Sequence, residues 1–264
     1  MKYLYKYPQW KFPYEQLVAE NAKRSKAESE YQLIDTGAFE DDRYFDCFIE
    51  VAKEAHAPDE LLFRVTAYNR GPEAAHLHII PQVWYRNTWS WGPEQDAKKP
   101  VIKQIAPLTA QTKHEKLGHQ FCQLSPSPGI GQSGQDVQPQ MLFTENETNL
   151  HALYGSKNPQ PYVKDAFHRH IVNREREAVN PRCRGSKLAA HYAFDEGKGV
   201  EPGECAVVRF RLSRKHQDYL DEEYFDEVIE QRRIEADEFY WRISPLPMTV
   251  CTFRSGVFLV GTFV

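Results

Sequence analysis

The stretch RYFDCFIEV, residues 43–51, decides the fold class of this chain. Its side chains alternate, so that one face carries Phe45, Cys47, Ile49 and Val51 and the other carries Tyr44, Asp46, Phe48 and Glu50. A period of two residues is typical of a β-strand, because successive side chains of a strand point to opposite faces of the sheet. The stretch LLFRVTAY (61–68) repeats the alternation and predicts a second strand.

Further strands are predicted along most of the chain. They cover residues 77–85, 101–105, 120–124, 140–145, 189–194 and 205–213. The turn signal in residues 69–72, Asn-Arg-Gly-Pro, predicts an antiparallel hairpin of strands 61–68 and 77–85, with Pro81 at an edge or a bulge. The segment DEGKGVEPGE (195–204) is predicted to join the last two strands as a turn.

Helices are expected near the two ends of the chain. Residues 13–30 begin with a proline and carry a narrow apolar side. Residues 221–243 place Phe225, Val228, Ile229 and Ala236 at helical spacing. Many short strands with helices at the periphery favour an antiparallel β-sandwich, expected to occupy residues 1–220 as one domain.

Composition narrows the class of function. The chain has 264 residues and a formal net charge of −4, which argues against a sequence-independent grip on nucleic acid. Its five cysteines are scattered without CxxC spacing, so buried reduced thiols are expected, with no disulfide framework and no zinc site. No signal peptide or membrane-spanning segment is visible, and a cytoplasmic location is expected.

Two histidine patterns resemble parts of metal sites. HEKLGH (114–119) spaces its histidines at i and i+5, so they do not share one face of a helix as the zinc motif HExxH requires. His76 and His78 alternate on a predicted strand and would point the same way, but the sequence offers no third ligand. A hydrogen-bonded sheet face explains this pair better, and no metal or other cofactor is predicted.

The stretch WYRNTWSW, residues 84–91, is the best candidate for a site. It holds three of the five tryptophans of the chain, with hydrogen-bonding side chains between them. The candidate residues are Trp84, Arg86, Asn87, Trp89 and Trp91. Aromatic rings stack on the C–H faces of sugars while arginine and asparagine bind hydroxyls. Three interpretations stay open: core filling, a seam between domains, and direct contact with a sugar. Alternation would place Trp84, Arg86 and Thr88 on one side and Tyr85, Asn87 and Trp89 on the other.

Acidic residues gather in two further stretches, EDDRYFD (40–46) and FTENETN (143–149). A glycosidase needs two opposed carboxyl groups, about 5 to 10 Å apart depending on the mechanism. Sequence spacing does not establish such a pair, and solvated acids at turns are the simpler interpretation. A small hydrolase that uses Asp41, Asp42 or Glu145 is therefore a minor hypothesis.

Six stretches together resemble one family. They are YKYPQWKFPYEQLVAEN, DTGAFEDDRYFDCFIEVAKE, AYNRGPEAAHLHIIPQVWYRNTWSWG, MLFTENETN, YVKDAFHRHIV and QRRIEADEFY, within residues 1 to 243. In order and spacing they resemble the N-terminal β-domain of family 63 of the glycoside hydrolases. That family includes processing α-glucosidase I and bacterial relatives such as mannosylglycerate hydrolases.

The resemblance implies a β-supersandwich, the galactose-mutarotase-like fold, with 221–243 as a connector helix to an (α/α)6 barrel. The family hydrolyses α-glycosidic bonds with inversion through two barrel carboxylates, and uses no metal. After Ser244-Pro245 this sequence departs from the family and continues as an atypical tail, so that 244–264 have no counterpart. The expectation is a chain without the catalytic barrel, inactive alone, with no catalytic residue of its own.

The predicted function is therefore the N-terminal domain of an inverting α-glycosidase that acts on α-linked oligosaccharides or glycosides. The predicted partners are a carbohydrate substrate and the barrel, with neither nucleic acid nor a membrane. WYRNTWSW is expected to serve the seam with the barrel or the rim of the sugar site, and its tryptophans should be partly exposed. The alternative is a stand-alone carbohydrate-binding β-sandwich.

Overall fold

The structure, a computed structural model, describes residues 1–91, 98–129, 134–194, 199–217 and 219–244. Its strands are β1 (Lys2–Pro8), β2 (Tyr44–Lys53), β3 (Leu61–Asn69), β4 (Leu77–Ile79), β5 (Gln82–Trp84), β6 (Val101–Ala106), β7 (Thr109–His114), β8 (Gly118–Leu124), β9 (Gln140–Thr144), β10 (Arg184–Gly185), β11 (Lys187–Phe194) and β12 (Cys205–Ser213). Its α-helices are α1 (Tyr14–Lys23), α2 (Leu150–Tyr154), α3 (Ala166–Val172) and α4 (Glu222–Ile243).

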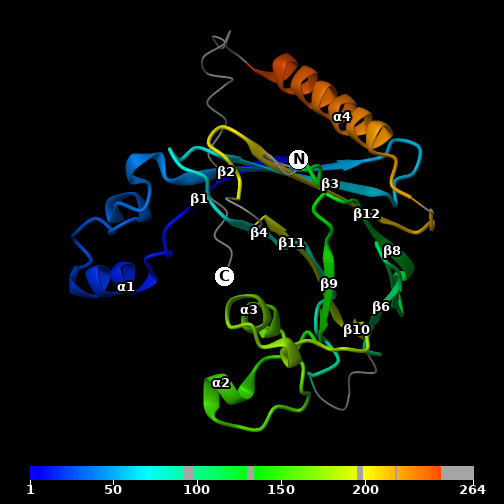
Figure 1. The fold of residues 1–264 in the computed structure, drawn as a ribbon, viewed down its shortest axis with the longest axis horizontal. Coiled ribbons are helices and arrows are strands. Elements are labelled where there is room, and N and C mark those ends of the chain that lie inside the picture. Colours follow the sequence, from blue (N-terminus) through cyan, green and yellow to red (C-terminus); the bar gives the residue numbers. More distant parts are fainter. Residues whose placement is uncertain (92–97, 130–133, 195–198, 218, 245–264) are drawn as a thin grey trace.

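Two antiparallel sheets account for these strands. The larger sheet has the order β1-β2-β3-β12-β8-β7-β6-β10. In the smaller sheet, β11 pairs with β4 and β5 and also with β9. Figure 1 shows the sheets facing each other, with α4 over the outer side of the large sheet and α3 beside the small one. The prediction of a mainly β, antiparallel sandwich is confirmed.

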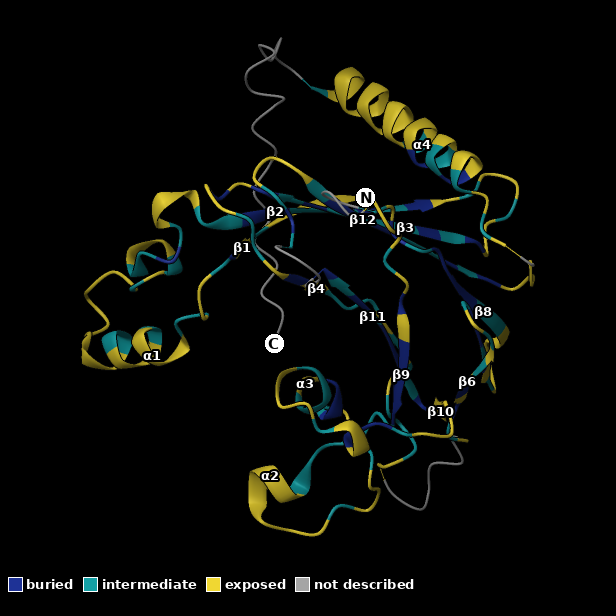
Figure 2. Ribbon diagram, viewed as in Figure 1, coloured by how far each residue is buried: buried dark blue, intermediate teal, exposed yellow. Residues whose placement is uncertain are grey.

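The main core lies between the two sheets. It collects the inward faces of both, with fully buried side chains that include Phe45, Ala67, Phe143, Leu188, Tyr192 and Val208. Figure 2 shows these strands in the colours of buried and half-buried residues, while α1, α2 and α4 are mostly exposed. Two smaller clusters join α3 to the small sheet and α4 to the large sheet. Burial of apolar area at these layers stabilises the sandwich at roughly 25 cal/mol per Å².

The predicted hairpin of 61–68 with 77–85 is wrong. β3 pairs with β2 and β12, whereas β4 and β5 pair with β11 in the other sheet. The turn between them is a corner that crosses from one sheet to the other. Asn69, which is fully buried, holds this corner by donating hydrogen bonds to Glu73 O and Val200 O, each at 2.8 Å. The segment 195–204 likewise connects different sheets, because β11 and β12 do not pair.

Pro81 interrupts the strand at the edge of the small sheet, as predicted. β4 and β5 keep one register along β11, with Ile79 opposite Tyr192 and Val83 opposite Leu188. Pro81 has no N–H to give, but its carbonyl accepts from Ala190 N at 2.9 Å. The nitrogen and carbonyl of one strand residue point to the same side, so the missing N–H leaves one ladder bond unmade opposite Ala190, between β4 and β5.

The first helix is shorter than predicted. α1 spans Tyr14–Lys23, not 13–30, and buries no residue. Arg24, the residue after the helix, has an extended backbone. The side chain of Asn21 hydrogen-bonds the backbone on both sides of the following loop: its Nδ2 donates to Leu17 O and Tyr31 O, and its Oδ1 accepts from Tyr31 N. A helix without a buried apolar face has little to extend it beyond such a stop.

The burial of the cysteines agrees only in part with the expectation of buried reduced thiols. Cys47, Cys122 and Cys205 are buried or half-buried, and burial raises the pKa of Cys47 and of Cys122 to about 12. Cys183 is exposed, which contradicts the expectation that the cysteines are buried. It lies in the turn before β10, outside the packed layers. All four are free thiols, and Cys251 lies outside the described residues.

α4 agrees with the helix predicted over residues 221–243, starting one residue later. Its buried residues, Phe225 and Ile229, lie in its first half and pack on Ala52 and Leu62. Its last turns expose Phe239, Tyr240, Trp241 and Ile243. The predicted tail lies outside the described residues from 245 onward. Within the described part of the chain, the helices are too short or too polar to cross a membrane.

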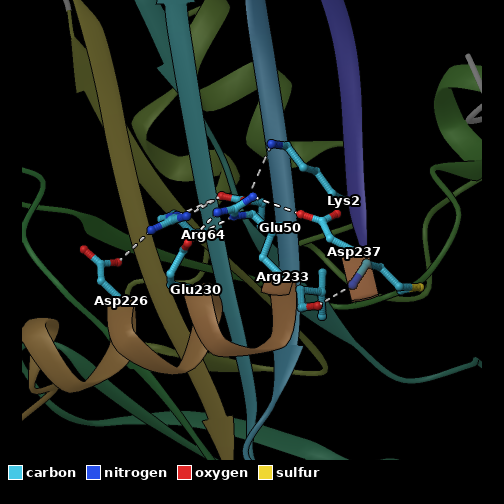
Figure 3. Close-up of polar contacts among 9 residues, drawn as sticks. Lys2, Glu50, Arg64, Asp226, Glu230, Arg233 and Asp237 are labelled. Carbon is cyan, nitrogen blue, oxygen red and sulfur yellow. Dashed lines mark hydrogen bonds and ion pairs between the residues drawn. The ribbon is translucent and has the colours of Figure 1, made fainter. Parts of the chain in front are cut away.

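An ionic network also fixes α4 to the large sheet (Figure 3). Arg64 of β3 lies between Glu50 of β2 at 2.7 Å and Asp226 of α4 at 3.1 Å. Arg209 of β12 reaches Asp226 from the other side, at 2.6 Å. Burial by itself would raise the pKa of Asp226, but hydrogen bonds and charges from Arg209 and Arg64 outweigh it and hold that pKa below its usual value.

Acid is expected to loosen α4. The pKa of Asp226 is lower in the folded state, so its contribution to stability is complete above the unfolded value of about 3.9 and is lost as the pH falls through the folded value. Asp226→Asn should therefore destabilise the protein at pH 7 and lose this effect towards pH 3. Urea unfolding at both pH values measures it. Asp237→Asn is the control, because that exposed carboxylate pairs with Arg233 of the same helix. An equal effect of both substitutions would contradict the role of Asp226.

Candidate functional site

The segment that follows β5 carries the predicted site residues. Tyr85 turns inward, where its hydroxyl donates to Gln120 Oε1 at 2.9 Å and lies 2.6 Å from Thr112 Oγ1. Burial raises the pKa of Tyr85. Because neighbouring side chains alternate, Trp84 and Arg86 on either side of it point outward, and the indole of Trp84 is 53% exposed.

Asn87 fixes the turn that comes next. Its Oδ1 accepts from Ser90 N at 3.2 Å and from Ser90 Oγ at 2.9 Å, an arrangement that asparagine favours in turns. Its Nδ2 donates to Asn146 O at 2.9 Å, and Asn146 Nδ2 donates back to Tyr85 O at 3.0 Å. These bonds join the two stretches that the sequence singled out, 84–91 and 143–149.

The acidic stretch places two carboxylates beside the tryptophans. Lys99 Nζ lies 2.8 Å from Glu145 Oε2 and 2.7 Å from Glu147 Oε1. Trp89 Nε1 points at Glu147 Oε1 over a long 3.5 Å, and Ser186 Oγ donates to Glu145 Oε2 at 2.6 Å. Burial by itself would lower the pKa of Lys99, but its hydrogen bonds to both glutamates outweigh burial and raise it. One ammonium therefore bridges two carboxylates.

Two cations lie against tryptophan rings on the same segment. Lys187 Nζ of β11 lies 5.2 Å from the ring centroid of Trp84, its register partner across the sheet. Arg86 lies 4.8 Å from the ring centroid of Trp91, which is 55% exposed. Such cation–π contacts stabilise exposed rings by about 0.5–1 kcal/mol and hold them in a fixed orientation.

We call this group of residues the tryptophan site: Trp84, Arg86, Asn87, Trp89, Trp91, Lys99, Glu145, Glu147 and Lys187. The exposure of Trp84 and Trp91 confirms the expectation of partly exposed tryptophans and contradicts core filling for these two rings. The predicted alternation holds as far as Asn87 and ends there, because residues 88–91 form a turn.

Sequence analysis missed Lys99, Ser186 and Lys187. None of them lies in a motif, and the predicted strand 189–194 began after Lys187, although β11 starts there. Pairing of β11 with β5 and β9 brings these residues to the tryptophans. A local pattern contains no signal for such a contact.

The other sequence candidates do not gather into a site. Asp41 and Asp42 lie in an exposed turn with left-handed backbone, φ 56° and 55°, and none of their described contacts reaches Glu145. His78 Nδ1 lies 2.9 Å from His191 Nε2 on the small sheet, which agrees with the expected hydrogen-bonded face. His114 Nδ1 accepts from the backbone of a tight turn. The described residues contain no group of three histidine, cysteine or acidic side chains that could hold a metal.

The chain is similar in sequence to a curated protein of yeast. The uncharacterized protein YMR196W of Saccharomyces cerevisiae is 37% identical over 279 aligned residues, which cover 94% of this chain and 25% of the relative. The chain thus spans a quarter of the length of the curated relative it matches. No model of a protein family matches the chain.

Proposed function

We propose that this chain is the N-terminal β-domain of an inverting α-glycosidase of the family 63 type. In this proposal it acts on α-linked oligosaccharides or glycosides together with an (α/α)6 catalytic barrel, and contributes no catalytic residue itself. The tryptophan site serves the joint with the barrel at the rim of the sugar site. The location is cytoplasmic, with no role for nucleic acid, a membrane, a metal or a cofactor.

One observation carries the proposal. Trp84 and Trp91 are exposed on a segment that Tyr85 and Asn87 hold in place. Large aromatic rings on a preorganised segment are typical of contact surfaces, because little conformational entropy is lost when a partner covers them. Glu147, Lys99 and Arg86 supply the polar groups that a sugar or a partner surface would need around those rings.

The end of α4 supports the same proposal independently. Phe239, Tyr240, Trp241 and Ile243 are each more than half exposed. A helix whose last turns expose large aromatic side chains fits a connector that packs on another domain. The yeast relative is about four times as long as the aligned region, which leaves room for such a domain in that protein.

A stand-alone carbohydrate-binding module is the alternative, favoured by the same exposed rings beside Glu147 and Lys99. It needs no barrel and predicts that the chain alone binds maltotriose. Trp84 is a contact residue in both functions. The barrel covers it in the first, and a sugar covers it in the second.

The test measures acrylamide quenching of tryptophan fluorescence. Translation of the 3′ flank of the gene in three frames would identify a barrel to express beside this chain. We expect the barrel to protect Trp84 from acrylamide, and Trp84→Ala to weaken the complex by about tenfold or more, as for a central interface residue. Trp10→Ala is the matched control, since Trp10 is 60% exposed on another part of the surface, and it should have little effect.

Two outcomes decide between the functions. Saturable binding of maltotriose by the chain alone, lost in Trp84→Ala and kept in Trp10→Ala, would favour the binding module. Unchanged quenching of Trp84 in the presence of the barrel would refute the joint.

A further inference from the structure

Lys187 is a half-buried lysine held between two aromatic rings. It begins β11, opposite Trp84 on one side and Thr144 on the other. Its Nζ lies 5.2 Å from the ring centroid of Trp84 and 5.6 Å from that of Phe167, which belongs to α3. The rings leave the ammonium a defined position at the edge of the tryptophan site.

No carboxylate accompanies this ammonium among the described residues. The other partly buried lysines differ: Lys6 Nζ lies 2.6 Å from Asp46, and Lys99 contacts both Glu145 and Glu147. Their ion pairs raise the pKa of each of those two lysines above the usual value, although burial opposes it. Lysines are seldom buried without a partner, because desolvation of the charge is costly.

The charge of Lys164 also acts on Lys187. The pKa of Lys187 is lowered, first by burial and then by the charge of Lys164. Lys164 is exposed, and its backbone N–H donates to Glu147 O at 2.9 Å, which ties its loop to the acidic stretch. Glu145 and Glu147 contact Lys99, and neither forms an ion pair with Lys187 among the described residues. Lys187 therefore lies at the edge of the tryptophan site without a carboxylate partner in the described part of the chain.

We infer that Lys187 binds the oxyanion of a ligand, a phosphate monoester or a carboxylate on a sugar, whose ring lies against the exposed part of Trp84. An oxyanion would supply the missing counter-charge through charge-assisted hydrogen bonds. The sugar part of this ligand rests on the proposed function, whereas the oxyanion part rests on Lys187 alone.

The experiment titrates the purified chain with inorganic phosphate, glucose 6-phosphate and glucose, followed by calorimetry and tryptophan fluorescence. We expect phosphate and glucose 6-phosphate to bind, and glucose to bind more weakly. Lys187→Met, which keeps the aliphatic stem against Trp84, should weaken glucose 6-phosphate by about tenfold or more through loss of the charged contact. Lys187→Arg should retain most of the affinity. Lys113→Met, at an exposed lysine of β7, should leave it unchanged.

A second measurement does not depend on a variant. Reductive methylation with ¹³C-formaldehyde labels the lysines, and the Lys187 signal, assigned by its absence in Lys187→Met, should move on addition of phosphate while the Lys113 signal does not. Equal affinity of Lys187→Met and wild type for glucose 6-phosphate would overturn the inference. So would equal binding of glucose and glucose 6-phosphate, or no saturable binding of either anion. Binding of phosphate without protection of Trp84 by a barrel would support this site and contradict the proposed joint.

Discussion

Arg211→Ala is expected to destabilise the protein by about 3–5 kcal/mol, the cost of leaving one member of a buried ion pair alone. Arg211 of β12 is 3% exposed, and its Nη1 lies 3.2 Å from Oε1 of Glu60, which is 5% exposed. The guanidinium also donates to Gln123 and Gln217. Removing it leaves the Glu60 carboxylate without a counter-charge in a place that water does not reach. The midpoint of urea unfolding measures the loss.

Two controls separate this effect from a general sensitivity of the region. Arg214→Ala breaks an exposed pair with Asp59 at 3.6 Å and should cost less than about 1 kcal/mol. The double change Arg211→Met with Glu60→Leu should recover most of the loss, because an apolar pair of similar volume carries no desolvation penalty. A loss below about 1 kcal/mol for Arg211→Ala would show that Glu60 finds another partner at little cost.

Gly185→Ala is expected to destabilise the protein at the upper end of the ~1–3 kcal/mol that overpacked sites lose, and to disrupt the tryptophan site. A Cβ on Gly185 would lie 2.2 Å from Thr144 O, a backbone atom that cannot rotate away. The strands β9 and β10 would have to separate. That movement would break the bonds from Ser186 Oγ to Glu145 and from Asn146 N to Ser186 Oγ, at 2.6 and 2.8 Å. Thermal unfolding and the sugar titrations above measure both consequences.

Gly155→Ala is the matched control. Gly155 has a left-handed φ of 67°, but a Cβ there meets nothing within 4 Å. Its substitution should cost about 1–2 kcal/mol of backbone strain and leave binding unchanged. If Gly185→Ala behaved in the same way, close approach of the two backbones would not be what holds the acidic stretch in place.

Local sequence patterns predicted much of the fold. The two-residue alternation in 43–51, 61–68 and 205–213 predicted β2, β3 and β12, because each strand of a sandwich turns one face to the core. Helical spacing in 221–243 predicted α4 nearly to the residue. β1 was missed, since its exposed tyrosines and lysines show no apolar face, and its pairing with β2 comes from the backbone.

The candidate site divides in the same way. The density of tryptophans predicts a site at 84–91, and the clustered acids single out 143–149, but neither pattern indicates that the two stretches touch. The two stretches are joined by hydrogen bonds from the side-chain amides of Asn87 and Asn146, and by strand pairing that no local pattern encodes.

The sequence by itself determined the class of fold, the positions of most strands, the last helix and the aromatic segment, because periodicity and residue type act over a few neighbours. Only the tertiary structure decided which strands pair, so that residues 69–76 became a corner between sheets instead of a hairpin turn. It also decided that Lys99 meets two carboxylates while Lys187 meets none of those in the described residues. Such pairings depend on the packing of distant segments, and the free energy that selects them comes from burial of the whole core.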